Sequence, residues 1–345
     1  MISSMRHSLI LLLFVLSQLT ATGASETFRL LQWNIWQEGT SVKGGYEAIV
    51  NEIARLRPDF VTFSEVRNYH QSNFTAKLVN DLRKRGETYY SFYSYDSGLL
   101  SRYPLHDSLT VFPCEGDHGS VYRLRCEAKG VKFAVYTAHL DYQDDTYYKV
   151  RGYDGNNWRE IPILRDSAEV LRRNNLSQRD EGIQAFLRTA QQDADAGYVV
   201  VLGGDFNEPS HLDWTKATRY LYDHHGLVIP WPVTSMLSEA GFTDIYRARW
   251  NNPLTHPGFT YPSANPAVSV NRLSWAPLAD ERERIDYLFC KGKGVEVTHA
   301  CLFGPEESIA YFRPRPNPTP ECFIKPLDVW PSDHKGVWGE IRVTR

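Results

Sequence analysis

Residues 198–209, with the sequence YVVVLGGDFNEP, place a carboxylate and an amide directly after a run of apolar residues. Asp205 and Asn207 are two residues apart, so in an extended chain both side chains leave the same face. A carboxylate and an amide held together at the end of a rigid strand suit a hard metal ion, a phosphate group, or both. The alternative is an Asx-rich turn, against which the rest of the chain argues.

The residues around this pair indicate how it is held. Residues 198–203 are apolar with several β-branched members, which predicts a buried strand. Gly203 and Gly204 are expected to let the backbone turn tightly after the strand, and Pro209 is expected to end any continuation.

Other predicted strands also end or begin at polar residues. Asn34, Glu65 and His139 end three of them, whereas Asp286 and the pair Asp333–His334 stand where strands begin. In antiparallel neighbours the end of one strand lies beside the start of the next, so these side chains can meet at one edge. A single polar residue at a strand end is more often structural. The convergence of the whole set predicts a site.

The hydrophobic pattern predicts the elements that position these residues. Apolar residues at helical spacing predict helices at 45–57, 73–84 and 178–193. Apolar or alternating segments predict strands at 28–34, 59–65, 88–94, 97–102, 106–113, 120–127, 131–138, 198–203, 284–290, 295–303 and 336–343. Residues 141–176 and 210–275 lack a clear period. This order of elements favours a sheet core with outer helices, in a single domain over residues 25–345.

Composition and the N-terminus bound the class of protein. The chain has 42% hydrophobic and 23% charged residues, which is ordinary for a globular protein. Its net charge of -3 gives no bulk attraction to polyanions, which disfavours nucleic acid as a substrate without excluding it. Residues 1–24 resemble a secretory signal, because Arg6 and His7 precede a short apolar run and small residues follow. We expect cleavage after Ala24 and a secreted or periplasmic monomer without a transmembrane segment.

The five cysteines fit an oxidising compartment, and none has the C-x-x-C spacing of a thiolate metal site. Cys114 and Cys126 flank one expected hairpin, and Cys290 and Cys301 flank another, so either pair can form a disulfide. One thiol must stay unpaired, and the connectivity stays open.

Seven segments resemble, in order, the motifs of the endonuclease/exonuclease/phosphatase superfamily, which includes DNase-I-like nucleases, apurinic endonucleases, neutral sphingomyelinases and inositol-polyphosphate phosphatases. The segments are QWN (32–34), SEV (64–66), GLLSRYPL (98–105), TAHLD (137–141), GGDFN (203–207), RIDYLF (284–289) and SDH (332–334). The resemblance covers nearly the whole chain after residue 24. It implies an α/β (α+β) fold, a four-layer α/β/β/α sandwich of two mostly antiparallel sheets with outer helices. It also implies divalent-metal-dependent hydrolysis of a phosphoester.

The resemblance implies a metal site at three of the strand-end residues. Glu65 would be the main Mg²⁺ ligand, assisted by Asn34, and Asp333 would be a further carboxylate on the metal side. Hard cations prefer such oxygen ligands, and Mn²⁺ or Ca²⁺ are alternatives. The cation would polarise a phosphoryl oxygen and neutralise charge on the leaving group.

The same motifs imply catalytic roles for five residues. Asp205 would orient or deprotonate the attacking water, and Asn207 would donate to a phosphate oxygen. His139 would bind the scissile phosphate. His334 would contact phosphate or shuttle a proton, with its ring fixed by Asp286 through the other nitrogen.

Substrate specificity is expected in the long loops around the site. In residues 141–176, Tyr153 and Trp158 belong to a set of aromatic and arginine residues that can stack on a sugar or base and hold an extra phosphate. An aromatic mini-core that stabilises the loop is an equal alternative. Tyr261, in a later loop, is a candidate to line the pocket, and Arg102 either reaches phosphate or has a surface role.

The favoured function is that of a secreted divalent-metal-dependent phosphodiesterase or phosphatase acting on a small phosphorylated molecule or a lipid headgroup. A secreted DNase-type endonuclease is the alternative. A non-catalytic binding protein on the same scaffold is disfavoured because every expected polar position is filled.

Overall fold

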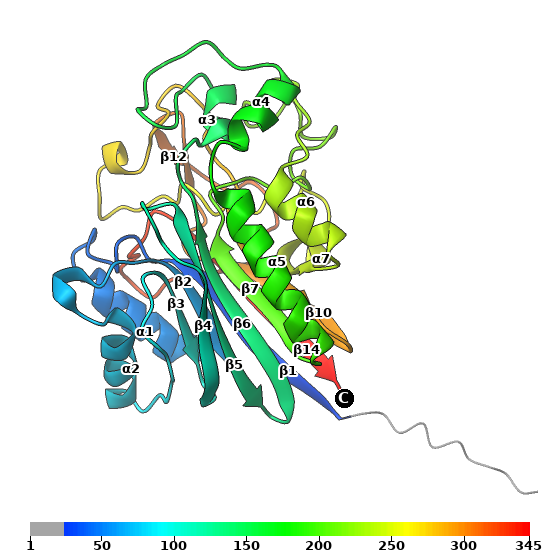
Figure 1. The fold of residues 1–345 in the computed structure, drawn as a ribbon. Coiled ribbons are helices and arrows are strands. Elements are labelled where there is room, and N and C mark those ends of the chain that lie inside the picture. Colours follow the sequence, from blue (N-terminus) through cyan, green and yellow to red (C-terminus); the bar gives the residue numbers. More distant parts are fainter. Residues whose placement is uncertain (1–23) are drawn as a thin grey trace, which may run out of the picture.

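The computed structural model describes residues 24–345 (Figure 1), so the expected signal segment lies outside the described residues apart from Ala24. Two six-stranded sheets form the core, with strand orders β13-β10-β14-β1-β2-β3 and β4-β5-β6-β7-β9-β8. The first contains β1 (Ser25–Asn34), β2 (Phe60–Val66), β3 (Asp96–Ser101), β10 (Val295–Phe303), β13 (Phe323–Ile324) and β14 (Gly336–Thr344). The second contains β4 (Leu105–Phe112), β5 (Gly119–Ala128), β6 (Val131–Leu140), β7 (Val199–Asp205), β8 (Thr243–Asp244) and β9 (Asp286–Lys291).

The remaining elements are helices and one small ribbon. The helices are α1 (Gly45–Leu56), α2 (Phe74–Lys84), α3 (Thr146–Val150), α4 (Ser167–Asn174), α5 (Arg179–Asp195), α6 (Pro232–Glu239) and α7 (Ile245–Arg249), with 3-10 turns at Tyr69–Gln71 and Val270–Arg272. The strands β11 (Ser308–Ala310) and β12 (Arg313–Arg315) pair with each other. The pairs β1–β2, β6–β7 and β10–β13 are parallel and the other pairs are antiparallel, so both sheets are mixed.

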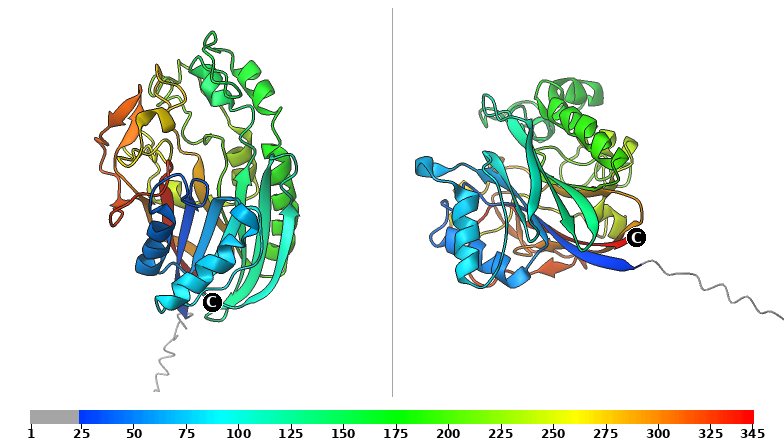
Figure 2. Two further views of the ribbon diagram at one scale, coloured as in Figure 1. Left: turned by 90° about the vertical axis from the view of Figure 1, so that its left-hand side faces the viewer. Right: turned by 60° about the horizontal axis from the view of Figure 1, so that its bottom comes forward.

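Alternation of side chains along the strands creates the layers. In β1, Leu30 packs between the two sheets with Phe133 of β6, whereas its neighbour Leu31 faces the helices α1 and α2. Successive residues of a strand point to opposite faces, so an all-apolar strand can serve two cores at once. On the far side, Tyr136 of β6 and Phe186 of α5 belong to a third cluster that α5 and α6 cover. Figure 1 and Figure 2 show α1 and α2 on one side and α5 and α6 on the other, which confirms the four-layer sandwich.

Segments beyond one end of the sheets form a cap over the strand ends. α3 and α4 lie there in Figure 1, and aromatic residues of this region pack into a cluster of their own. The aromatic mini-core weighed for residues 141–176 is therefore present, and these residues contain two short helices rather than only irregular chain.

Two expectations about local structure are wrong. Residues 88–94 form no strand and pair only through an isolated bridge between Tyr90 and Ser101. Gly203 and Gly204 do not turn, because β7 continues through them to Asp205. A Cβ atom on Gly203 would lie 2.2 Å from Oγ1 of Thr62, so the glycine serves the close approach of the two sheets.

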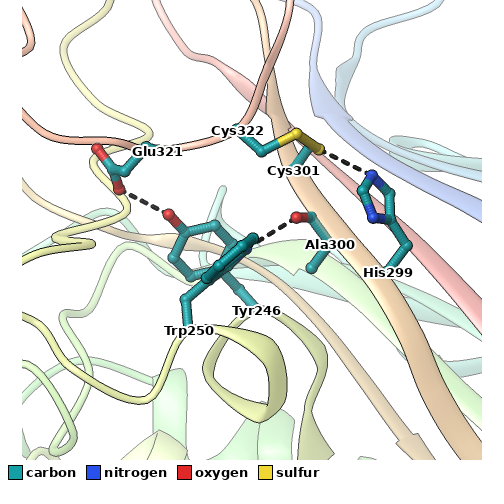
Figure 3. The surroundings of a disulfide bond; sticks show 7 residues. All are labelled: Tyr246, Trp250, His299, Ala300, Cys301, Glu321 and Cys322. Carbon is teal, nitrogen blue, oxygen red and sulfur yellow. Dashed lines mark hydrogen bonds between the residues drawn. A yellow bond between two sulfur atoms is a disulfide. The ribbon is translucent and has the colours of Figure 1, made fainter.

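The disulfide also differs from both expected pairs. Cys301 of β10 is bonded to Cys322 (Figure 3). Cys114, Cys126 and Cys290 are free. The pairing depends on the parallel contact of β10 with β13, which brings residues 322–324 beside the end of β10. Around it, Trp250 donates a hydrogen bond to the carbonyl of Ala300. The disulfide anchors the loop that leads to the start of β14.

Across residues 24–345 the structure contains no helix with the length and apolar character needed to cross a membrane.

Candidate active site

The polar residues at the strand ends surround one cleft of about 390 Å³. Those that line it are Glu65, His139, Asp205, Asn207, Asp333 and His334. Asn34 and Asp286 are fully buried against them, with hydrogen bonds to Asp205 and His334 respectively. The structure therefore brings together all eight residues that the sequence assigned to catalysis and metal binding.

Strand register places Asp205 at the centre of this group. Asp205 is opposite His139 in the parallel pair β6–β7 and opposite Asp286 in the antiparallel pair β7–β9. Three neighbouring strands thus deliver a histidine and two carboxylates at one level of the sheet. Ligand atoms of Asp205, Asp286 and His334 lie within 4.8 Å of one another.

Two histidines flank the carboxylate of Asp205, and each is held by a second carboxylate. Nδ1 of His139 lies 2.8 Å from Oδ1 of Asp96, and its Nε2 lies 3.9 Å from Oδ2 of Asp205. Nδ1 of His334 lies 2.9 Å from Oδ2 of Asp286, and its Nε2 lies 3.8 Å from the same oxygen of Asp205. The predicted contact of Asp286 with the far nitrogen of His334 is present.

Charge in this cluster is set by burial and by these pairs. Burial opposes a positive charge on both rings, but Asp96 raises the pKa of His139 to about 9 and Asp286 raises the pKa of His334 to about 10. Burial, followed by the charge of Asp286, raises the pKa of Asp205 to about 6. Near neutral pH the arrangement is a weakly basic carboxylate between two imidazolium rings.

A β-bulge aims Glu65 into the cleft. The pairing of β2 with β3 shifts register between Ser64 and Val66, and Glu65 has a positive φ of 69°. Such a bulge redirects one side chain out of the strand's alternation. Oε2 of Glu65 accepts hydrogen bonds from the backbone N of Gln37 at 2.7 Å and from its Nε2 at 2.8 Å.

The amide of Asn34 connects Glu65 to Asp205. Its Nδ2 donates to Oε1 of Glu65 at 3.0 Å and to Oδ2 of Asp205 at 2.9 Å, while its Oδ1 accepts from the backbone N of Trp36 at 2.9 Å. In this arrangement Asn34 positions two carboxylates as a donor, and direct coordination of a metal by Asn34 stays a prediction.

Short polar side chains fix the strand ends relative to one another. Ser64 donates to the carbonyl of Ala138 and accepts from the backbone N of Asp205, both at 3.1 Å, which joins the two sheets beneath the cleft. Ser332 donates to the carbonyl of Asn34 at 2.7 Å and accepts from the backbone N of His334 at 3.0 Å. These bonds fix the relative positions of residues from five segments of the chain.

The residues on the Glu65 side fit a hard cation. Asp333 is 7% exposed and its Oδ1 is buried without a hydrogen-bond partner. Burial raises the pKa of Asp333 to about 7, and the charge of Glu65 adds to the effect. A buried carboxylate oxygen without a partner costs about 1–3 kcal/mol or more, which a bound cation would offset.

Asn207 is placed at the cleft by a positive φ of 49°. Oδ1 of Asp205 accepts a hydrogen bond from its backbone N at 3.0 Å, and Nδ2 of Asn207 donates to the carbonyl of Leu140 at 2.9 Å. The second hydrogen on Nδ2 is left for a ligand, as the predicted contact with a phosphate oxygen requires.

The structure divides the four predicted substrate-binding residues. Trp158 and Tyr261 line the cleft. Tyr153 does not line it, because it packs in the aromatic cluster and its hydroxyl accepts from the backbone N of Leu278. Arg102 is at the opposite end of the sheet, where it binds Glu87 at 2.7 Å. β3 runs antiparallel to β2, so the strand that begins with Asp96 at the cleft must end away from it.

Several residues of the cleft were missed from the sequence. Asp96, which binds Nδ1 of His139, was overlooked, although its position at the start of a strand opposite the end of β2 was a usable signal. Arg67 lines the cleft and pairs with Asp96 at 2.9 Å. Asp145 and Trp275 line it from loops without a periodic pattern, so the sequence did not indicate that they lie at the cleft. Asp145 belongs to an acidic run that is usually a solvated loop, but here it is buried.

Most of the chain matches the pattern of a known protein family. The pattern of the Endonuclease/Exonuclease/phosphatase family matches residues 31–334, which span all the residues of the site. The chain belongs to this family. Members of the Endonuclease/Exonuclease/phosphatase family are phosphoester hydrolases, so the chain falls in that class of enzyme.

A curated relative and two solved structures extend the comparison. The uncharacterized protein F14F9.5 of Caenorhabditis elegans is 29% identical over 336 residues, which cover 96% of each chain. TDP2 from D. rerio, complexed with a single-strand DNA product, has a TM-score of 0.52 at 16% identity and covers 91% of this chain and 98% of its own. Truncated TDP2 from Caenorhabditis elegans has a TM-score of 0.51 at 17% identity, with coverage of 92% and 98%. At this identity the structures confirm the fold of the family.

Proposed function

We propose that the protein is a secreted, Mg²⁺-dependent phosphodiesterase or phosphatase that hydrolyses a P–O bond of a small phosphorylated molecule or a lipid headgroup. The observation that carries the proposal is the position of Asp205 between His139 and His334, beside Glu65 and Asp333. These groups can accept a proton from water, bind a phosphoryl oxygen and donate to a leaving oxygen within one cleft.

Three residues have separate roles in the hydrolysis of a bound ester. Asp205 accepts a proton from water as the water oxygen attacks phosphorus and the ester P–O bond breaks. His139 donates from Nε2 to a phosphoryl oxygen, because Asp96 keeps the ring charged. His334, backed by Asp286, contacts the phosphate and delivers a proton to the leaving oxygen.

Glu65 and Asp333 would hold the divalent cation, with Asn34 beside them. When bound, the cation supplies positive charge that polarises the phosphoryl group and neutralises charge on the leaving oxygen. The unpartnered Oδ1 of Asp333 supports its place in this set.

A secreted DNase-type endonuclease is the second candidate. The structural similarity to TDP2 from D. rerio, which is complexed with a single-strand DNA product, supports it. The cleft argues against it. Arg67 is the one arginine or lysine that lines the cleft within residues 24–345, and Asp96 and Asp117 already pair with it at 2.9 and 3.1 Å. Binding of a nucleic acid backbone usually needs several free cations.

A substrate panel tests the proposal. The purified protein is given phosphomonoesters, small phosphodiesters and supercoiled plasmid, each with Mg²⁺ and with EDTA. We expect Mg²⁺-dependent turnover of the small esters and slow or no plasmid cleavage. Rapid plasmid nicking would favour the endonuclease, and turnover of none of the three would support a binding protein.

Secretion rests on residues 1–24 and on the disulfide Cys301–Cys322, because disulfides persist in oxidising compartments. N-terminal sequencing of the protein from the culture medium of a secreting host should begin at Ser25. A protein that keeps Met1 and stays inside the cell would contradict this part of the proposal.

A further inference from the structure

Aromatic rings form one wall of the cleft, next to the catalytic residues. The ring centroids of Tyr147 and Tyr148 are 4.5 Å apart, those of Tyr148 and Trp158 are 4.9 Å apart, and those of Trp158 and Trp275 are 4.9 Å apart. Tyr261 joins this wall to the site, because its ring lies 4.6 Å from that of His334. All five aromatic residues line the same cleft as Asp205.

A buried carboxylate lies in the same wall. Asp145 precedes α3 and is 7% exposed, and its side chain makes no capping hydrogen bond. Its ion pair is with Arg179, whose Nη1 is 3.5 Å from Oδ1 of Asp145. The same guanidinium group is shared with Glu208 at 3.8 Å and gives shorter hydrogen bonds to backbone carbonyls, such as that of Asp141 at 2.7 Å.

Asp145 is therefore only partly compensated. Burial raises its pKa well above the ordinary range, Arg179 opposes this, and the charges of Asp205 and Asp141 add to it. A cation that entered the cleft beside Asp145 would stabilise the ionised carboxylate.

The charge of the whole cleft also favours a cationic ligand. Five carboxylates line it within the described chain, those of Glu65, Asp117, Asp145, Asp205 and Asp333, against Arg67 and two histidines. A divalent cation beside Glu65 would leave the negative charge of Asp145 at the aromatic wall. No free arginine or lysine lines the cleft at this wall within the described chain. A second phosphate on the substrate would have no partner there, whereas a positive group would have both a carboxylate and aromatic faces.

We propose that the aromatic wall and Asp145 form a subsite for an organic cation of the trimethylammonium type, so that the substrate is a phosphodiester with a choline-like group. The proposal rests on the proposed phosphodiesterase function and specifies its substrate class. Aromatic rings attract quaternary ammonium groups through their negative faces, and a nearby carboxylate adds to the attraction.

Two synthetic esters of equal shape test the subsite. They are p-nitrophenyl phosphocholine and the p-nitrophenyl ester of 3,3-dimethylbutyl phosphate, in which carbon replaces the charged nitrogen. With Mg²⁺, kcat/KM for the cationic ester should exceed kcat/KM for the neutral ester by about tenfold or more. A single cation–π contact in a desolvated site is strong enough to produce a difference of this size. Equal values would overturn the proposal.

Substitutions test which residues cause the preference for the cationic ester. Asp145→Asn and Trp158→Leu should each bring the ratio of the two kcat/KM values close to one, and Asp144→Asn, at the adjacent residue, should keep the ratio of the native protein. A ratio unchanged in both subsite variants would overturn the assignment of these residues. If either variant fails to fold, the native protein still decides: tetramethylammonium should inhibit hydrolysis of bis(p-nitrophenyl) phosphate more strongly than neopentyl alcohol does, and equal inhibition would count against the subsite.

Further arms separate the remaining outcomes. Glycerophosphocholine and micellar lysophosphatidylcholine distinguish a soluble diester from a lipid headgroup, and turnover of either supports the subsite. Preference for the p-nitrophenyl ester of thymidine 5′-phosphate over the choline ester would overturn it in favour of a base-binding wall. If the protein hydrolyses bis(p-nitrophenyl) phosphate but shows no preference for the cationic over the neutral ester, only the subsite is contradicted. If it hydrolyses none of the esters, the proposed function itself is contradicted.

Discussion

His139 and Asp205 occupy paired positions on the parallel strands β6 and β7, and Nε2 of the histidine lies 3.9 Å from Oδ2 of the carboxylate. His334 approaches the same oxygen at 3.8 Å from the other side. The carboxylate is thus bracketed by two rings whose far nitrogens are each held by another aspartate. A proton acceptor between two cationic donors can assist the attack of water on a phosphoester.

Asp205→Asn should lower kcat by about 10²–10⁴-fold, the usual contribution of a positioned general base. The amide has nearly the shape of the carboxylate, so the fold and substrate binding should be kept. Steady-state kinetics and a thermal melt measure the two effects. Asp195→Asn, at an exposed aspartate at the end of α5, is the matched control and should behave like the native protein. Near-native kcat in Asp205→Asn would remove Asp205 from its role.

Asp96→Asn should move the alkaline limit of activity toward neutral pH. Asp96 holds the pKa of His139 at about 9, so without it the ring loses its proton at lower pH. The pH profile of kcat/KM should show the shift. Asp107→Asn, which alters a carboxylate paired with Arg123 and Arg125, should leave the profile unchanged. An unmoved alkaline limb in Asp96→Asn would show that His139 need not be charged.

The same variant carries a prediction about stability. Because the pKa of His139 is raised above 6.5 in the folded state, its favourable contribution is complete below about pH 6.5 and is lost as the pH rises through about 9. Urea unfolding should therefore show Asp96→Asn and the native protein differing most near about pH 6 and converging above about pH 9.

Sequence patterns predicted the site better than they predicted its surroundings. Glu65 and Asp205 follow apolar runs and lie at strand ends, so the rule that such ends meet at a sheet edge was enough to bring them together. Arg102 was misplaced because the motif that contains it says nothing about which end of β3 faces the cleft. Asp145 and Trp275 depend on how two long loops fold over the strand ends, and no local pattern specifies that packing.

Gly203→Ala should destabilise the fold by about 1–3 kcal/mol, the usual cost of overpacking. The new methyl group would lie 2.2 Å from Oγ1 of Thr62 and 3.0 Å from Cδ2 of Leu288, so the two sheets must separate locally. Denaturant unfolding measures the loss. Reduced activity should accompany it, because Asp205 is two residues away on the same strand. Native stability would show that the glycine is not needed for close packing.

Cys322→Ser should lower the free energy of unfolding by about 3 kcal/mol, since the disulfide closes a loop with a sequence separation of 21 residues. Dithiothreitol should destabilise the native protein by a similar amount and should have no further effect on the variant. Cys114→Ser, at a free and partly buried cysteine, should respond to the reductant like the native protein. Equal stability of Cys322→Ser and the native protein would contradict the pairing.

Titration of activity with Mg²⁺ tests the central claim most directly. After EDTA treatment and removal of the chelator, hydrolysis of bis(p-nitrophenyl) phosphate should be absent and should return as Mg²⁺ is added. Glu65→Gln should raise the Mg²⁺ concentration for half-maximal rate by at least about tenfold, whereas Glu127→Gln, at an exposed position of β5, should titrate like the native protein. Full activity without added cation, or a native titration curve for Glu65→Gln, would contradict the account of a cation-assisted attack of water on phosphorus in this cleft.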